Sequence, residues 1–123
     1  MKYYLCEICG NLVELVEEGG GELVCCGQPM KELIPKTTEE GNEKHLPIME
    51  INGNKVIVKV GSVPHPMTSE HYIKWIVILY NGKCQRTKLT PESKPEAIFE
   101  IENNVTDIKA YAYCNVHGLW VSK

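Results

Sequence analysis

Four of the six cysteines of this 123-residue chain lie within its first 26 residues, and they constrain what that segment can fold into. Cys6 and Cys9 form a Cys-x-x-Cys pair, whereas Cys25 and Cys26 are adjacent. So short a segment buries too little apolar surface to fold by itself, so we expect a metal ion to hold it together. The spacing of the four cysteines suits iron or zinc. The alternatives are a structural zinc ribbon and a redox dithiol at Cys6 and Cys9.

The adjacent pair predicts an unusual ligand cage. Neighbouring side chains on an extended backbone point to opposite sides. Cys25 and Cys26 therefore reach one metal ion only if the cage is distorted.

A polar stretch follows the cysteine-rich segment. Residues 35–42 read Pro-Lys-Thr-Thr-Glu-Glu-Gly-Asn, which is typical of a linker between domains. We therefore expect two domains, a small metal-bound one over residues 1–36 and a larger one over residues 37–123.

Beyond the linker, apolar residues recur with a period of two, which indicates strands. Asn81-Gly82 is a strong hairpin signal, and Asn52-Gly53-Asn54 marks a second turn. Hydrophobic residues make up 43% of the chain, enough for a core. Short strands without an amphipathic helix predict a mainly β chain whose second domain is a β-sandwich. The clearest strand signals lie at residues 55–60, 73–80, 83–89 and 108–113.

All four histidines lie after the linker, together with a fifth cysteine. A lone histidine is weak evidence for a metal site, but the contexts here favour one. Pro64 and Pro66 restrict the backbone around His65, and the Cys114-Asn115-Val116-His117 segment has metal-ligand spacing. Four imidazoles and a thiolate exceed a tetrahedral zinc site, but they fit iron with four nitrogens in a plane, an axial sulfur and one open position. The candidate ligands are His45, His65, His71, Cys114 and His117.

Two charged residues directly precede the first of these histidines. Glu43 and Lys44 would ordinarily be read as a solvated linker face. Beside His45, however, Lys44 is placed to attract an anion, and Glu43 to act as a displaceable ligand of the oxidised metal.

The remaining chemically notable side chains favour structural roles. Cys84 stands alone on an expected strand, where we predict a small buried hydrophobe. Four aromatic residues in strand segments predict core or pocket packing: Trp75, Tyr111, Tyr113 and Trp120.

Charge and hydropathy exclude several function classes. The net charge is -3 with both signs mixed, which argues against nucleic-acid binding and requires a local cation for any anionic substrate. The apolar run of residues 75–80 is too short to span a bilayer, and no targeting segment is visible. We expect a cytoplasmic protein, in which cysteines serve as metal ligands more often than as disulfides.

Taken together, these segments resemble the desulfoferrodoxin family over essentially the whole chain. The matching segments are Cys6–Gly10, Glu22–Gly27, Glu43–His45, Lys59–Met67, His71–Ile73 and Cys114–Gly118. The resemblance implies a desulforedoxin-like first domain, an immunoglobulin-like second domain and a homodimer. It also implies two irons per chain, one on Cys6, Cys9, Cys25 and Cys26, the other on His45, His65, His71, His117 and Cys114.

The function implied by this resemblance is superoxide reduction to hydrogen peroxide without dioxygen, with rubredoxin as the electron donor. In that family pattern Glu43 ligates the oxidised iron, Lys44 guides superoxide, and the Val116 and His117 amides hydrogen-bond the Cys114 sulfur. The rival hypotheses are a non-enzymatic iron electron carrier and a structural zinc protein.

Overall fold

A computed structural model describes residues 2–38, 45–61, 65–103 and 105–122 of the chain. The fold separates into two compact units, Met1–Ile34 and Pro35–Lys123. Every regular element of the described residues is a strand, so none of them forms a helix that would cross a membrane. The predicted mainly β fold, with a small cysteine-rich domain followed by a β-sandwich, is confirmed. Glu43, Lys44 and Pro64 lie outside the described residues.

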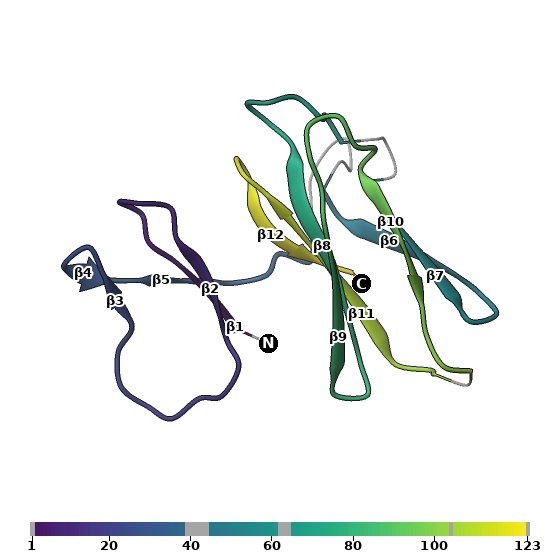
Figure 1. Ribbon diagram of the computed structural model, residues 1–123, viewed down its shortest axis with the longest axis horizontal. Coiled ribbons are helices and arrows are strands. Elements are labelled where there is room, and N and C mark those ends of the chain that lie inside the picture. Colours follow the sequence, from purple (N-terminus) through teal and green to yellow (C-terminus); the bar gives the residue numbers. More distant parts are fainter. Residues whose placement is uncertain (1, 39–44, 62–64, 104, 123) are drawn as a thin grey trace. The chain divides into compact units, whose positions relative to one another are not determined.

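The first unit consists of five short strands (Figure 1). Three of them form an antiparallel sheet in the order β2-β1-β5, and two form a small hairpin. The strands are β1 (Lys2–Leu5), β2 (Leu12–Leu15), β3 (Val24–Cys25), β4 (Gln28–Pro29) and β5 (Lys31–Leu33).

Very little apolar surface is buried in this unit. Of its described residues, Tyr3 and Cys6 are the buried hydrophobic ones, while Val16 is 84% exposed and Ile34 69% exposed. A sheet of strands this short, without an apolar core, is marginal in water. The unit therefore depends on its cysteines.

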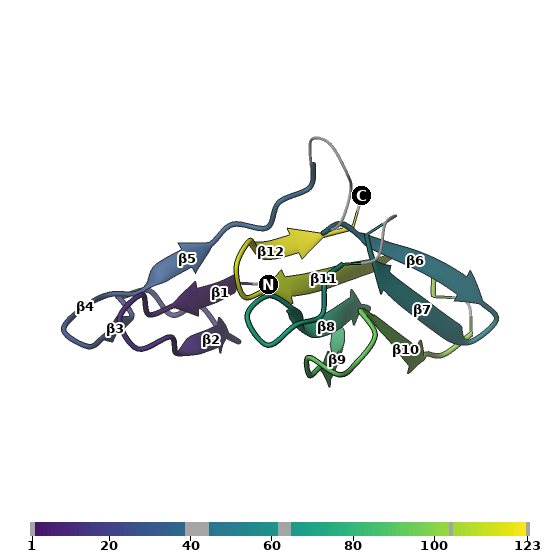
Figure 2. The ribbon, with the colours of Figure 1, turned by 90° about the horizontal axis from the view of Figure 1, so that it is seen from above.

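The second unit is a sandwich of two antiparallel sheets (Figures 1 and 2). One has the order β10-β7-β6 and the other β12-β11-β8-β9. The strands are β6 (Pro47–Asn52), β7 (Lys55–Val60), β8 (Ile73–Tyr80), β9 (Lys83–Lys88), β10 (Glu96–Glu100), β11 (Ile108–Cys114) and β12 (Gly118–Val121).

The turn between β8 and β9 forms where the sequence predicted it. Asn81 and Gly82 both have positive φ, 48° and 72°, as a two-residue turn between twisted strands requires. The hairpin pairs Tyr80 with Lys83 and continues to Trp75 opposite Lys88.

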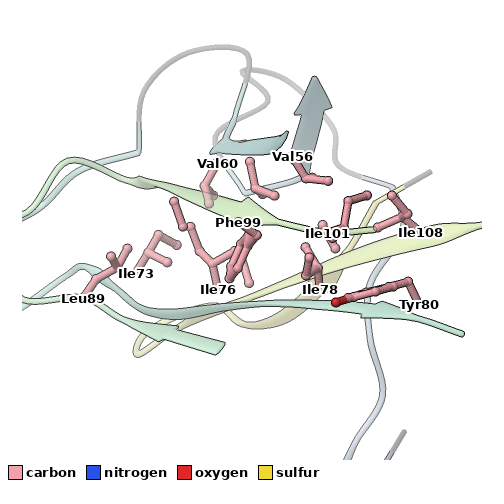
Figure 3. Packing of buried hydrophobic residues seen from close by; sticks show 14 of the residues in the cluster. Val56, Val60, Ile73, Ile76, Ile78, Tyr80, Leu89, Phe99, Ile101 and Ile108 are labelled. Carbon is pink, nitrogen blue, oxygen red and sulfur yellow. The ribbon is translucent and has the colours of Figure 1, made fainter. Parts of the chain in front are cut away.

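The core lies between the two sheets, and Figure 3 shows side chains from both meeting there. Val56 and Val58 of β7 and Ile76 and Ile78 of β8 are all 0% exposed. This packing fixes the strand ends, from which the loops carrying the histidines leave.

One prediction about this unit is wrong. Cys84 is exposed rather than buried. It lies on β9, which has a neighbouring strand on one side only, and the burial of β9 side chains is correspondingly low.

Candidate metal centres

The first cysteine pair lies on a tight turn that follows β1. The Cys6 amide donates to the Asn11 carbonyl at 2.8 Å, and the Gly10 amide donates to the Cys6 carbonyl at 2.9 Å. The Cys9 amide points at the Cys6 sulfur, 3.4 Å away. Backbone donors aimed at a sulfur stabilise a thiolate there, as a metal ligand requires.

In the second pair, the backbone conformation allows two adjacent cysteines to point toward one site. Cys25 ends β3, and Cys26 has φ 54°, in the left-handed region that a non-glycine residue adopts at a cost of about 1–3 kcal/mol. This turn of the chain brings the two sulfurs within 3.9 Å of each other. The prediction of a distorted cage assumed an extended backbone, whereas the backbone at Cys26 is left-handed.

The four sulfurs fit a tetrahedral metal ion. They lie within 4.8 Å of one another, with Cys9 and Cys25 only 3.6 Å apart. Metal–sulfur bonds of about 2.3 Å place the corners of a tetrahedron about 3.8 Å apart. The Cys9 amide lowers the pKa of Cys6 to about 6, whereas contact with the Cys9 thiol raises the pKa of Cys26 to about 12. Four thiolates at this spacing need a bound cation.

The second cluster gathers side chains from four loops and strand ends of the sandwich. His45 lies two residues before β6, His65 and His71 lie between β7 and β8, Cys114 ends β11, and His117 lies in the turn before β12. His45, His65 and Cys114 are buried, at 7%, 3% and 0% exposure. Three imidazoles and the thiol offer ligand atoms within 4.8 Å of one another.

The four imidazoles form a square. Going round from His45 through His65, His71 and His117, neighbouring ring centroids are 4.7, 4.7, 4.9 and 4.6 Å apart. Neighbouring rings are steeply inclined, whereas the diagonal pair His45 and His71 is 6.3 Å apart and inclined by only 29°. His117, which is exposed, also joins the thiol, with its Nδ1 3.9 Å from the Cys114 sulfur. The structure thus brings together all five predicted ligands of this cluster.

His65 is held in the tautomer of a metal ligand. Its Nδ1 donates to the Pro66 carbonyl at 2.7 Å, which leaves Nε2 as the acceptor. That Nε2 is buried without a hydrogen-bond partner among the described residues. Burial lowers the pKa of His65 to about 4, and the neighbouring imidazoles act in the same direction. A neutral, unsatisfied nitrogen facing a thiol and three other imidazoles fits a metal ion.

His71 is positioned by two residues that the sequence reasoning missed. The His71 amide donates to the Thr68 hydroxyl at 3.1 Å. Asn115 joins this loop to the next: its amide group donates to the Glu70 carbonyl and its oxygen accepts from the Tyr72 amide, both at 3.0 Å. An asparagine within a Cys-x-x-His segment was the available signal.

Cys114 has the surroundings of a metal-bound thiolate. The His117 amide lies 3.4 Å from its sulfur and points toward it. Burial raises the pKa of the Cys114 thiol, although the His117 and Val116 amides and the Lys36 ammonium lower it. A bound metal ion removes the proton from such a thiol outright.

Behind the imidazole square lies Trp120 of β12, which packs parallel to His45 at 4.8 Å with an interplanar angle of 16°. Lys36 in turn lies over the Trp120 ring and donates to the His117 carbonyl. The predicted packing role of the strand aromatics is confirmed, since Trp75, Tyr111, Tyr113 and Trp120 are all buried. Lys36 was read only as part of the linker.

Comparison with known proteins identifies the family. The family model "Desulfoferrodoxin" matches residues 37–123, and "Desulfoferrodoxin, N-terminal domain" matches residues 1–33. The chain belongs to the desulfoferrodoxin family. A desulfoferrodoxin homolog from Archaeoglobus fulgidus is 53% identical, over 99% of this chain and 96% of that protein.

Solved and curated superoxide reductases are also similar. The superoxide reductase from Treponema pallidum superposes with a TM-score of 0.83 at 31% identity, covering 99% of this chain and 97% of that one. A superoxide reductase from Thermococcus kodakarensis is 33% identical, over 72% of this chain and 94% of that protein. Together with the two donor clusters, this confirms the predicted cofactor content of two irons per chain.

Proposed function

We propose that the chain is a superoxide reductase, which reduces superoxide to hydrogen peroxide and releases no dioxygen. The observation that carries this proposal is the square of four imidazoles beside the buried Cys114 thiol. Four imidazole nitrogens and one thiolate sulfur would hold an iron ion and leave room for a small ligand, which a closed tetrahedral site would not.

The ligands proposed for the two irons follow from these clusters. The first iron takes four sulfurs and the second takes four nitrogens and one sulfur. The proposed sets are Cys6, Cys9, Cys25 and Cys26 for the first, and His45, His65, His71, His117 and Cys114 for the second.

The reaction is a one-electron reduction. A ferrous iron held by these residues would supply the one electron that, with two protons from solvent, converts superoxide to hydrogen peroxide. The Cys114 thiolate donates electron density to the metal, and the His117 amide moderates that donation by its hydrogen bond to the sulfur. His65 stays neutral because its pKa is low, so it keeps a lone pair for the metal.

Glu43 and Lys44 complete the proposal, on sequence grounds alone. Lys44 attracts superoxide to a protein whose net charge is -3, and Glu43 ligates the oxidised iron between turnovers. Both residues directly precede His45 in the chain.

The wider setting is proposed as well. Residues 1–36 form the desulforedoxin-like iron domain, and residues 37–123 form the catalytic domain. A rubredoxin-like protein supplies electrons, the chain forms a homodimer, and it works in the cytoplasm.

Metal analysis combined with a superoxide-consumption assay tests the proposal. Cys84, which is in neither proposed ligand set, offers a matched control. We expect two irons per chain and rapid superoxide loss without dioxygen release. Cys114→Ser should remove the sulfur-to-iron charge-transfer band of the oxidised second site and abolish most turnover. Cys84→Ser should change neither, because Cys84 is exposed on the edge strand β9.

Anion binding, measured beside superoxide consumption, distinguishes an enzyme from an electron carrier. Azide or cyanide should alter the spectrum of the second iron if that site accepts an external ligand. A protein that holds two irons, accepts donor electrons, yet neither binds these anions nor consumes superoxide would be an electron carrier.

A further inference from the structure

Lys36 has a fixed backbone beside the second metal centre. Its amide donates to the Leu119 carbonyl at 2.9 Å, and its carbonyl accepts from the Val121 amide at 3.0 Å. These bonds form a parallel bridge between Lys36 and Trp120, outside the named strands. Because the amide and the carbonyl of Lys36 are both hydrogen-bonded to β12, its side chain leaves the backbone at a fixed position.

That side chain contacts one proposed iron ligand and an aromatic ring that stacks on another. Its ammonium donates to the His117 carbonyl at 3.0 Å. It also lies 5.0 Å from the centre of the Trp120 ring, and the same ring stacks parallel to His45. The Lys36 charge is thus in direct contact with the backbone of His117, and one aromatic ring separates it from His45.

We propose that Lys36 is a positioning residue whose charge biases the second iron toward its reduced form. Four neutral imidazoles and one thiolate leave ferric iron one unit more positive than ferrous iron. A fixed cation nearby therefore destabilises the ferric state more than the ferrous state. Lys36 is exposed, so solvent screens part of this effect, and we expect it to be modest. The proposal rests on the iron site of the proposed function and concerns its redox equilibrium.

A redox titration of the full, iron-loaded chain tests this, followed at the charge-transfer band that Cys114→Ser removes. Lys36→Met keeps the aliphatic stem and deletes the charge. We expect it to shift the ferrous–ferric equilibrium roughly threefold toward ferric iron, a fall of about 28 mV at 59 mV per tenfold. Lys36→Arg should keep the wild-type potential, because it keeps both charge and donor. Lys36→Gln, which keeps only the donor, should behave like Lys36→Met.

The control is Lys55→Met, which makes the same change in net charge at the far end of β7. Lys55 lies about 17 Å along that strand from Val60. The potential should stay unchanged there, and the Lys36→Met shift should shrink near 1 M salt, where the Debye length is about 3 Å. An unchanged or raised potential in Lys36→Met, an equal fall in Lys36→Arg, or an equal fall in Lys55→Met would each overturn the inference. If the Lys36 variants show these shifts but the wild-type chain consumes no superoxide, the proposed function fails and the role of Lys36 stands.

Discussion

The two units of the chain differ in whether the metal or a hydrophobic core stabilises the fold. In the first, Tyr3 and Cys6 are the buried hydrophobic residues of the described part, and the cysteines lie in turns and at a strand end of a unit without a core. In the second, a core between two sheets includes Val56, Val58 and Ile76, all 0% exposed. One unit needs its metal in order to fold, whereas the other has a fold that presents ligands to a metal.

This difference explains the contrast between the ligands. The strained ligand is Cys26, with φ 54°, in the unit whose metal maintains the structure. In the sandwich, residues that do not bind metal position the ligands: the His71 amide donates to Thr68, and Asn115 is hydrogen-bonded to both neighbours of His71. A reactive metal requires such a preorganised frame, since its ligands must stay in place while its oxidation state changes.

The sharpest test of the comparison is to remove one ligand of the first iron. Cys25→Ser should abolish or alter the chromophore of the first unit and unfold much of it, because little apolar surface holds it together. The second unit should keep its iron and most superoxide reduction. Visible spectra, backbone amide resonances and the superoxide assay measure these effects separately.

A variant with a normal second iron and no remaining activity would contradict this division. It would mean that the first iron takes part in turnover.

The complementary test removes a core side chain of the second unit and leaves both metal centres intact. Ile76→Ala removes a side chain that is 0% exposed between the sheets, so the free energy of unfolding of the second unit should fall by about 2–5 kcal/mol. The spectrum of the first iron should not change. The matched control is Ile98→Ala on β10, where the side chain is 64% exposed and the loss should stay within about 0.5 kcal/mol. Equal losses in denaturant titrations of both variants would show that the core is not where stability resides.

Much of this contrast was predictable from the sequence, because it depends on local patterns. The strand predicted over residues 73–80 coincides with β8, and the Asn81-Gly82 turn connects it to β9. The two clusters followed from donor chemistry and from the family resemblance.

What was not predictable depends on how distant segments meet. No local pattern reveals the left-handed backbone of Cys26 or the square arrangement of four imidazoles from three loops. Lys36 looked like linker because its partners, Trp120 and His117, are some eighty residues away. Cys84 was misplaced because sequence alone does not say which strand lies at a sheet edge.

Substrate attraction gives a smaller effect, confined to the second iron. The net charge of -3 repels superoxide, so we expect Lys44 to offset that repulsion locally. One charge about 5 Å from the anion contributes on the order of 1–3 kcal/mol, and screening favours the lower end. Lys44→Ala should slow the bimolecular reaction roughly ten- to thirtyfold and flatten its salt dependence, while Lys44→Arg keeps much of both. A wild-type rate for Lys44→Ala at low salt, in pulse radiolysis, would rule out steering.

The smallest effect concerns protons and the sandwich without metal. The pKa of His65 is lowered to about 4 from 6.5, mainly by burial. Between these values the unfolded chain binds more protons than the folded one, so folding stability falls as pH drops from about 6.5 to 4. Above pH 6.5 this residue adds no slope. Urea titrations of the metal-free protein should therefore show a free energy of unfolding that falls with pH in that window. His65→Gln should make this fall smaller. An identical slope in both proteins would show that His65 is not buried as a neutral ring before the metal binds.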